Sequence, residues 1–473
     1  MKITKSTIKL TADTKAVIAQ FHKVQDRTQI ERIVERINGL NEEEVNNTLK
    51  KVFNDFSGRH RNIEEAFTDH CKQLEYNIGS SHSNFSNNKK LLLGMFFTQE
   101  YSFQAAALFN PSVVPHPDQT GLISAEQRFI MSLRATGEGH ISSIAFQTGI
   151  IDASGNITLD AASGYFTPLK KNTEAILTKE FIIKRASLSE SFDKSVINAL
   201  PETFTTDEAL HILNSAEYAN NDSARFLKEV LNKNYELKLS VHLPINEKVI
   251  FPSAADERMG MEDVRFVKFT DNEQIIYYGT YTAYDGKIIT SRLIETTDFE
   301  VFKIRALYGK AVNDKGMALF PEKINGKYVM VSRQGGHDMN IMFSDDLYIW
   351  QDFELLSEPQ YTWDLMKTGN CGSPIKTDKG WLLLTHGVGT MRTYVISAIL
   401  LDLNDPKKII GRLDKALLQA EGDEREGYVP NVVYTCGMLR HENLLFIPYG
   451  LSDAAIGFAT VDLNELLDEI LFH

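Results

Sequence analysis

Apolar residues change their spacing along the chain, and the change separates a helical part from a β-rich part. Residues 4–10 and 16–21 alternate like two short strands, and residues 28–37 then place apolar side chains three and four apart, as in an amphipathic helix. Asn41 followed by Glu44 predicts a capping box at the start of a second helix, and residues 62–76 predict a third. We therefore expect a mainly helical N-terminal extension over residues 1–100.

From about residue 110 onward, one unit recurs: a short apolar strand, a turn, a stronger apolar strand and a third alternating strand. Turn signals such as Asn325-Gly326 precede most of the middle strands. The middle strands span residues 128–133, 274–281, 327–333, 380–386 and 443–449. Five units at this spacing predict an all-β fold, a five-bladed β-propeller over residues 101–473. A β-sandwich with helical additions is the alternative, but sandwich strands do not normally recur as five equivalent triplets.

The first interval between units is too long for one propeller blade. Inside it, residues 208–213 and 226–231 have the spacing of helices, which predicts a helical insertion at about residues 204–235. The N-terminal helices are expected to act as a brace or a subunit contact rather than in catalysis, which leaves a homo-oligomer open.

Composition narrows the class of partner. The net charge of -13 argues against nucleic acid, because neutralising phosphate backbones needs clustered Lys and Arg. Cys71, Cys371 and Cys436 are far apart and lack CxxC spacing, so we expect reduced core thiols. No signal peptide or membrane-spanning run is evident, which predicts a cytoplasmic protein that does not contact membranes. Zinc-binding histidine motifs are also missing from the sequence, and we expect no metal and no cofactor.

In a propeller, the inner strands of all blades meet at one central channel, so polar residues at equivalent positions become neighbours. Carboxylates, arginines and tyrosines gathered there would suit a sugar. This rule selects Asn110, Arg134, Glu262, Asp263, Arg265, Tyr281, Tyr284, Asp285, Asp314, Lys315, Arg333, His337, Lys376, His386, Arg392, Asn431, Tyr449 and Asp453.

Glu262 and Asp263 are neighbours in a predicted strand, where side chains alternate between faces. We therefore expect one of them to line the channel and the other to tie down a blade. Asp263 would share a face with Arg265, and a guanidinium beside a carboxylate lowers the pKa of that carboxylate. A purely structural ion pair at the start of a strand would have the same spacing.

Three cations, Lys315, Arg333 and Lys376, come from different units but occupy comparable places near the inner rim. Converging cations hold a phosphate through charge-assisted hydrogen bonds, whereas the alternative is that each faces solvent. His386 ends an apolar run, where a histidine is often only a hydrogen-bonded rim residue.

Taken together and in order, several motifs resemble glycoside hydrolase family 130, which comprises β-mannoside phosphorylases and β-1,2-mannosidases with a five-bladed propeller. The resemblance runs from about Asn110 to the C-terminus, and the helical N-terminal part is similar to that of the family's longer members. The motifs are Phe109-Asn110-Pro111, Gly260-Met261-Glu262-Asp263-Val264-Arg265, Tyr281-Thr282-Ala283-Tyr284-Asp285-Gly286, Leu319-Phe320-Pro321-Glu322-Lys323, Pro374-Ile375-Lys376-Thr377, His386-Gly387-Val388, Asn431-Val432-Val433-Tyr434-Thr435-Cys436-Gly437 and Tyr449-Gly450-Leu451-Ser452-Asp453.

The resemblance implies a catalytic acid at Asp263, in a Glu-Asp-Pro-Arg motif whose proline is Val264 here. This acid would act by relay through a mannose hydroxyl, while phosphate attacks the anomeric carbon from the opposite face with inversion. Lys315 stands where an Arg is expected, which removes a bidentate fork. The implied phosphate-binding residues are Lys315, Arg333, Lys376 and His386, and the implied substrate-binding residues are Asn110, Arg134, Glu262, Arg265, Tyr281, Tyr284, Asp285 and Asp453.

The implied function is an inverting β-mannoside phosphorylase, which would cleave β-1,2-linked manno-oligosaccharides with inorganic phosphate as co-substrate and release α-mannose 1-phosphate. The alternative is an inverting β-1,2-mannosidase that activates water with Glu322, Glu424 or Glu426, its two carboxyl groups roughly 6.5–9.5 Å apart. A third hypothesis is a non-catalytic propeller that binds glycans.

Overall fold

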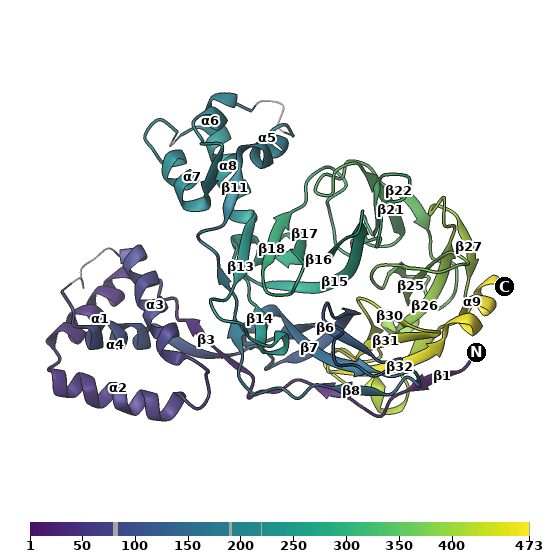
Figure 1. Cartoon of the computed structure of the whole chain (residues 1–473), viewed down its shortest axis with the longest axis horizontal. Coiled ribbons are helices and arrows are strands. Elements are labelled where there is room, and N and C mark those ends of the chain that lie inside the picture. The colour runs from purple at the N-terminus through teal and green to yellow at the C-terminus, as the bar shows by residue number, and fades with distance from the viewer. Residues whose placement is uncertain (79–83, 189–191, 219, 473) are drawn as a thin grey trace.

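Strands dominate the chain from Thr98 onward, and the helices gather mainly in two lobes that stand apart from the sheets (Figure 1). This computed structural model describes residues 1–78, 84–188, 192–218 and 220–472. The prediction of a mainly β protein with helical additions is confirmed. Within the described residues, no helix has both the length and the apolar character needed to cross a membrane.

The N-terminal lobe contains the three predicted helices and one that the sequence pattern missed. The capping box of Asn41 and Glu44 starts α2 as predicted. The missed helix, α4, has a continuous apolar run without helical spacing. Its Gly94 packs so tightly on α3 that an added Cβ would lie 1.9 Å from the carbonyl oxygen of Phe67. The helices are α1 (Arg27–Gly39), α2 (Glu42–Phe56), α3 (Ile63–Ile78) and α4 (Asn87–Phe96).

This helical lobe is inserted between two paired strands, β3 (Val17–Phe21) and β4 (Thr98–Ser102). The chain before it belongs elsewhere, because β1 (Ile3–Lys5) and β2 (Leu10–Thr11) both pair with β32 (Ala455–Asp462) in the last sheet. A single extension over residues 1–100 is therefore wrong at its N-terminal end, since the first strands complete the sheet formed by the end of the chain.

All five predicted middle strands are strands in the structure: β6 (Gln127–Thr136), β16 (Gln274–Tyr284), β20 (Tyr328–Ser332), β25 (Trp381–Val388) and β31 (Leu444–Leu451). Each lies between antiparallel neighbours, which defines five strand groups. The first group adds β5 (Ala107–Pro115), β7 (Ser142–Ile151) and β8 (Ile157–Leu159). The second adds β15 (Gly260–Asp271), β17 (Ile289–Thr296) and β18 (Phe302–Ala306). The third adds β19 (Ala318–Leu319), β21 (Met339–Ser344) and β22 (Glu354–Ser357).

The fourth and fifth groups are built in the same way. The fourth adds β23 (Lys367–Asn370), β24 (Ile375–Lys376), β26 (Tyr394–Leu401), β27 (Ile409–Arg412) and β28 (Leu418–Gln419), and the fifth adds β29 (Val433–Tyr434), β30 (Leu439–His441) and β32. The first two groups join in one 12-stranded sheet, where Gly260 of β15 pairs with Ser142 of β7. That sheet also contains β9 (Thr167–Pro168), β10 (Lys170–Lys171), β13 (Tyr235–Lys238) and β14 (Lys248–Ile250).

Each strand group shares a hydrophobic core with the next, and the fifth shares one with the first. The shared clusters contain Ile130 with Phe266, Phe269 with Met330, Val329 with Leu383, Leu384 with Ile447, and Phe446 with Met131. Each fully buried side chain of this size contributes about 1.5–3 kcal/mol. The shared cores therefore hold the groups that share them together.

The predicted helical insertion is present but larger than expected. Its helices α7 (Thr206–Leu213) and α8 (Asp222–Lys233) were predicted, whereas α5 (Lys179–Ala186) and α6 (Lys194–Asn198) were missed. The 5 residues of α6 are too few for a periodic pattern. The strands β11 (Ile176–Thr178) and β12 (Thr203–Thr205) pair within this lobe. A last helix, α9 (Leu463–Leu471), follows β32 and buries its apolar face in the core shared by the fourth and fifth groups.

Candidate functional site

One polar cavity of about 230 Å³ collects side chains from all five strand groups. Among the predicted residues, it brings together Asn110, Arg134, Asp263, Arg265, Lys315, Arg333, His386, Arg392 and Asp453. Its other lining residues are Phe109, Lys367, Tyr394, Val429, Val432 and Tyr434. Residues far apart in sequence therefore meet in one place, and we call this cavity the central pocket.

Two β-bulges shape the acidic side of the central pocket. The pairing register shifts between Phe109 and Ser112 on β5 and between Glu262 and Arg265 on β15. In these bulges Asn110 and Asp263 take φ values of 49° and 53°, a left-handed conformation that Asn and Asp adopt more readily than most residues. The Nδ2 of Asn110 donates a hydrogen bond of 2.7 Å to Oδ1 of Asp263.

The bulge also corrects one prediction. Strict alternation was expected to send Glu262 and Asp263 to opposite faces, but both carboxylates reach the same guanidinium. Arg134 Nη2 lies 2.7 Å from Glu262 Oε1, and Arg134 Nη1 lies 3.2 Å from Asp263 Oδ1. The side chains do not alternate here because the register shifts between Glu262 and Arg265.

The three carboxyl groups around Arg134 titrate differently. Burial alone raises the pKa of Asp263, but the charges of Arg134, Lys315 and Arg265 and the hydrogen bond from Asn110 outweigh it and hold this pKa well below its usual range. Burial raises the pKa of Glu262, although Arg134 opposes the shift. Burial and the nearby charge of Asp263 raise the pKa of Asp453 to about 6. Asp453 therefore holds a proton more readily than its neighbour Asp263.

The central pocket also contains a cluster of basic side chains. Lys315, Arg333, Lys367 and Arg392 all line it, and none of these four cations forms an ion pair with a carboxylate in the part of the chain that the structure describes. Burial and the charges of Arg333 and Lys315 lower the pKa of Lys367. Such a concentration of like charge favours an anionic ligand, which would relieve the repulsion.

His386 acts as an acceptor in this cluster. Its Nδ1 lies 3.1 Å from the carbonyl oxygen of Asn370, which can only accept, so Nδ1 carries the proton. Nε2 therefore accepts from Nη1 of Arg333 at 3.0 Å. Burial and the charges of Arg333 and Arg265 lower the pKa of His386 well below its usual value. The imidazole is thus neutral and orients the guanidinium.

Three buried polar atoms of this pocket have no hydrogen-bond partner among the described residues: Asn110 Oδ1, Arg265 Nε and Arg333 Nε. Leaving a buried polar group unpaired costs about 1–3 kcal/mol. One unpaired acceptor on the acidic side and unpaired donors nearby suit a ligand that offers hydroxyl groups at one end and anionic oxygens at the other.

Lys376 does not belong to this cluster, contrary to the prediction. It pairs with Trp381 at the far end of β25 from His386, and its Nζ lies 2.5 Å from Glu322 on the surface. Lys367 is the pocket lysine that the sequence pattern missed. It pairs with Val388, two residues beyond His386, at the start of β23. That short strand contains no strongly apolar residue, so no alternating pattern marked it.

Tyr281, Tyr284 and Asp285 are also not pocket residues. The Tyr281 hydroxyl donates to Glu257 Oε1 at 2.6 Å inside a buried network. Tyr284 pairs with Gly260 and Ile289 at the end of β16, and the Asp285 carboxylate accepts from the backbone N–H groups of the following turn. These residues support β15 and β16 rather than line the cavity.

The remaining candidates lie around the pocket or away from it. Glu424 accepts from Lys5 at 2.8 Å and from the Tyr449 hydroxyl at 3.2 Å, and Asn431 accepts from Arg425 at 2.8 Å. Among the described residues, no cluster of three or more His, Cys, Asp or Glu side chains is arranged to hold a metal ion. The three cysteines are buried.

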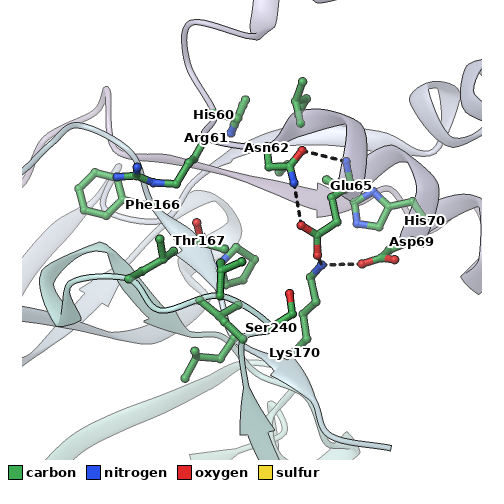
Figure 2. Close-up of a pocket in the computed structure, with 18 of the residues that line it drawn as sticks. His60, Arg61, Asn62, Glu65, Asp69, His70, Phe166, Thr167, Lys170 and Ser240 are labelled. Atoms are coloured by element: carbon green, nitrogen blue, oxygen red, sulfur yellow. Dashed lines mark hydrogen bonds and ion pairs between the residues drawn. The ribbon is translucent and has the colours of Figure 1, made fainter. Parts of the chain in front are cut away.

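A second cavity of about 230 Å³ lies where α3 meets β9 and β10. Figure 2 shows Lys170 reaching two carboxylates of α3, with Nζ 2.7 Å from Glu65 and 2.5 Å from Asp69. Asn62 bonds to Glu65 at 2.9 Å, and Arg61 pairs with Glu247. The charged groups of this cavity already pair with one another across the contact between the helical lobe and the sheets. We therefore interpret the cavity as part of a structural interface rather than as a ligand site.

The central pocket thus has the groups of a site for a polyhydroxylated ligand beside an anion. The chain belongs to glycoside hydrolase family 130, as the sequence motifs predicted: a family model described as beta-1,4-mannooligosaccharide phosphorylase matches residues 227–471, more than half of the chain.

Two curated relatives come from Thermoanaerobacter sp. (strain X514). A 1,2-beta-oligomannan phosphorylase is 36% identical over 232 residues, which cover 47% of this chain and 75% of the relative. A beta-1,2-mannobiose phosphorylase is 36% identical over 225 residues, covering 47% of this chain and 73% of the relative. Among solved structures, the beta-1,2-mannobiose phosphorylase of Listeria innocua in complex with beta-1,2-mannobiose aligns with a TM-score of 0.47 at 21% identity, over 78% of this chain and 93% of that one.

Proposed function

We propose that this chain is an inverting β-mannoside phosphorylase that cleaves β-1,2-linked manno-oligosaccharides with inorganic phosphate and releases α-mannose 1-phosphate. The observation that carries the proposal is the set of unpaired cations, Lys315, Arg333 and Lys367, in the same pocket as Asp263. The linkage is supported by the relatives, which are named as phosphorylases of 1,2-beta-oligomannan and beta-1,2-mannobiose.

The five strand groups are, in this proposal, the blades of a five-bladed propeller. The cyclic sharing of cores supports it, since each group packs on the next and the fifth packs on the first. Residues 101–473 together with β1 and β2 form the catalytic part. The helical lobe serves as a brace, which agrees with the paired charges at its joint.

Phosphate would bind through Lys315, Arg333 and Lys367, with neutral His386 orienting Arg333. A phosphate oxygen then forms a bond to the anomeric carbon while the bond to the glycosidic oxygen breaks, and the configuration inverts. The departing oxygen takes a proton from a mannose hydroxyl, which takes one from Asp263. Asn110, Arg134, Glu262, Arg265 and Asp453 hold the sugar.

Asp263 needs a proton for this role, and its low pKa in the free protein opposes protonation. The charge of Lys315 is one cause of that low pKa. A phosphate bound against Lys315 offsets this charge and therefore raises the pKa of Asp263. Phosphate binding and protonation of Asp263 are thus coupled. The acid is therefore protonated more readily when phosphate is bound beside the sugar.

The hydrolase alternative requires a second carboxylate to activate water. The three residues considered for it are unsuited: Glu322 pairs with Lys376 on the surface, Glu424 pairs with Lys5, and Glu426 does not line the central pocket. The cation cluster equally disfavours a purely glycan-binding protein, since a neutral glycan would leave these charges unpaired.

The test is to incubate the protein with β-1,2-mannobiose with and without phosphate and to follow products by phosphorus NMR. We expect α-mannose 1-phosphate, and mannose from the acceptor side, only when phosphate is present. Equal release of mannose without phosphate would establish the hydrolase instead. β-1,4-mannobiose is the control for linkage, because the family model is described by that linkage.

A further inference from the structure

An exposed tyrosine is next in sequence to a residue that lines the central pocket. Tyr428 is 61% exposed and immediately precedes Val429, which lines the pocket. Its ring centroid lies 6.0 Å from that of His140, and the two planes are inclined by only 32°. The Tyr428 hydroxyl is 3.5 Å from His140 Nδ1. Two aromatic rings therefore lie side by side, although both residues are exposed.

The loop that carries Tyr428 is tightly anchored. An added Cβ on Gly427 would lie 2.4 Å from the carbonyl oxygen of Ser452, so only glycine permits this approach. Val429 donates its N–H to the same oxygen at 2.9 Å, and Ser452 Oγ donates to the carbonyl of Glu424 at 2.7 Å. The loop is thus pressed onto the turn that contains Asp453, which fixes the place of Tyr428 relative to that carboxyl group.

His140 is anchored in a comparable way on the neighbouring element. It lies in the turn between β6 and β7, where the N–H of Gly137 donates to the carbonyl of Ile141 at 3.0 Å. The Tyr101 hydroxyl donates to the carbonyl of Glu138 in this turn at 2.7 Å. Arg134 lies on β6, the strand that leads into the turn. His140 therefore stands on the turn that follows the strand of Arg134, and Tyr428 stands on a loop that packs against the turn of Asp453.

The central pocket is small for a disaccharide plus phosphate. Its volume of about 230 Å³ lies below the roughly 300–1,000 Å³ of pockets that enclose drug-sized ligands. One sugar ring and an anion would fill it, so the second ring of a mannobiose lies outside, at the mouth. A pyranose has an apolar C–H face, and an aromatic side chain that is apolar on its face and polar at its edge suits such a ring.

We propose that Tyr428 and His140 form a platform on which the second sugar ring, the one on the leaving-group side, stacks during the reaction. The inference rests on the proposed function, which sets the direction in which the manno-oligosaccharide lies in the pocket. It assigns to Tyr428 a role in selecting the acceptor, while the pocket selects mannose and phosphate. Phosphate and the inner ring would not touch the platform.

The experiment compares Tyr428→Ala and Tyr428→Phe with the matched control Phe353→Ala, which removes an aromatic ring of 46% exposure away from the pocket. Each change is made in an Asp263→Asn background, so that binding is measured without turnover. Calorimetry gives the affinities for β-1,2-mannobiose, which needs the platform, and for α-mannose 1-phosphate, which does not.

We expect Tyr428→Ala to weaken mannobiose binding roughly three- to tenfold and to leave the affinity for α-mannose 1-phosphate within about twofold. Tyr428→Phe keeps the ring and should match the parent, as should Phe353→Ala. The platform is refuted if mannobiose affinity is unchanged in Tyr428→Ala, if both ligands weaken equally, or if the Phe variant behaves like Ala.

These binding measurements, together with the phosphorolysis assay of the parent protein, separate this inference from the proposed function. If the parent protein releases no α-mannose 1-phosphate but mannobiose binding depends on the Tyr428 ring, the platform is supported and the phosphorylase function is rejected. If the parent protein carries out phosphorolysis but mannobiose binding does not depend on the Tyr428 ring, the phosphorylase function is supported and the platform is rejected. Failure to bind mannobiose at all would overturn the platform.

Discussion

Arg134 and Asp263 are 129 positions apart in sequence, yet Nη1 of the arginine lies 3.2 Å from Oδ1 of the aspartate. The same guanidinium binds Glu262 at 2.7 Å. Burial raises the pKa of both carboxylates and Arg134 lowers both: at Glu262 burial prevails and the pKa is raised, whereas at Asp263 Arg134, further cations and Asn110 prevail and the pKa is lowered. This separation assigns different work to two residues that the sequence presents as a uniform acidic pair.

Asp263→Asn should abolish phosphorolysis, with a loss of at least about a hundredfold in kcat, the usual contribution of a general acid. The change preserves an oxygen that can accept from Asn110, so the fold should persist. Initial rates of α-mannose 1-phosphate release give the answer, with thermal unfolding as the control for folding. A variant that works at the parent rate would remove Asp263 from the mechanism.

Lys367→Ala should raise the KM for phosphate by about 10- to 100-fold, because a hydrogen bond to a charged group contributes about 1.5–3 kcal/mol. Lys376→Ala is the matched control and should leave this KM unchanged, since it breaks an exposed ion pair with Glu322 and a contact with the Trp381 ring, neither of which lines the pocket. Phosphate titrations at saturating mannobiose distinguish the two. If Lys376→Ala raised the KM for phosphate and Lys367→Ala did not, Lys376 and not Lys367 would be the phosphate-binding lysine.

Glu257→Ala should destabilise the protein by about 3–5 kcal/mol, because it removes the fully buried carboxylate that pairs with Arg292 and leaves only the more distant pair with Asp256, at 3.3 Å. Glu257 also accepts from the hydroxyls of Tyr235 and Tyr281, which would lose their partner. Urea unfolding measures the effect.

The control for this change is Glu354→Ala, which removes the exposed pair with Lys407 and should cost less than about 1 kcal/mol. Equal costs for the two variants would mean that burial does not set the strength of the Glu257 network.

The stability of the protein should fall between about pH 4 and pH 6 through Asp453. Its pKa is raised from 3.8 to about 6 in the folded state, so the folded protein binds this proton more tightly than the unfolded chain. The stabilisation is complete below the unfolded value and is lost as the pH rises through the folded value.

Asp453→Asn cannot titrate and should lack this part of the pH dependence. The difference in Tm between parent and variant, followed from pH 4 to pH 7, isolates it. A difference that stays constant across this range would show that the folded pKa of Asp453 is ordinary.

The sequence pattern predicted the parts that obey simple periodicity. Middle strands such as β25 were found because a continuous apolar run follows a turn signal, and α2 was found because its capping box is explicit. Lys367 was not predicted because β23 has no apolar run. Lys376 precedes such a run and was therefore predicted, wrongly, to lie with the pocket cations. The orientation of Glu262 and Asp263 depended on a bulge at two non-glycine residues, which alternation cannot reveal.

The pairing of β1 and β2 with β32 has a consequence for the central pocket. These two strands lie along β32, so without them β32 would present an edge of unpaired N–H and C=O groups. Asp453 lies in the turn just before β32. The order of a pocket carboxylate therefore depends in part on strands that are far from it in the sequence.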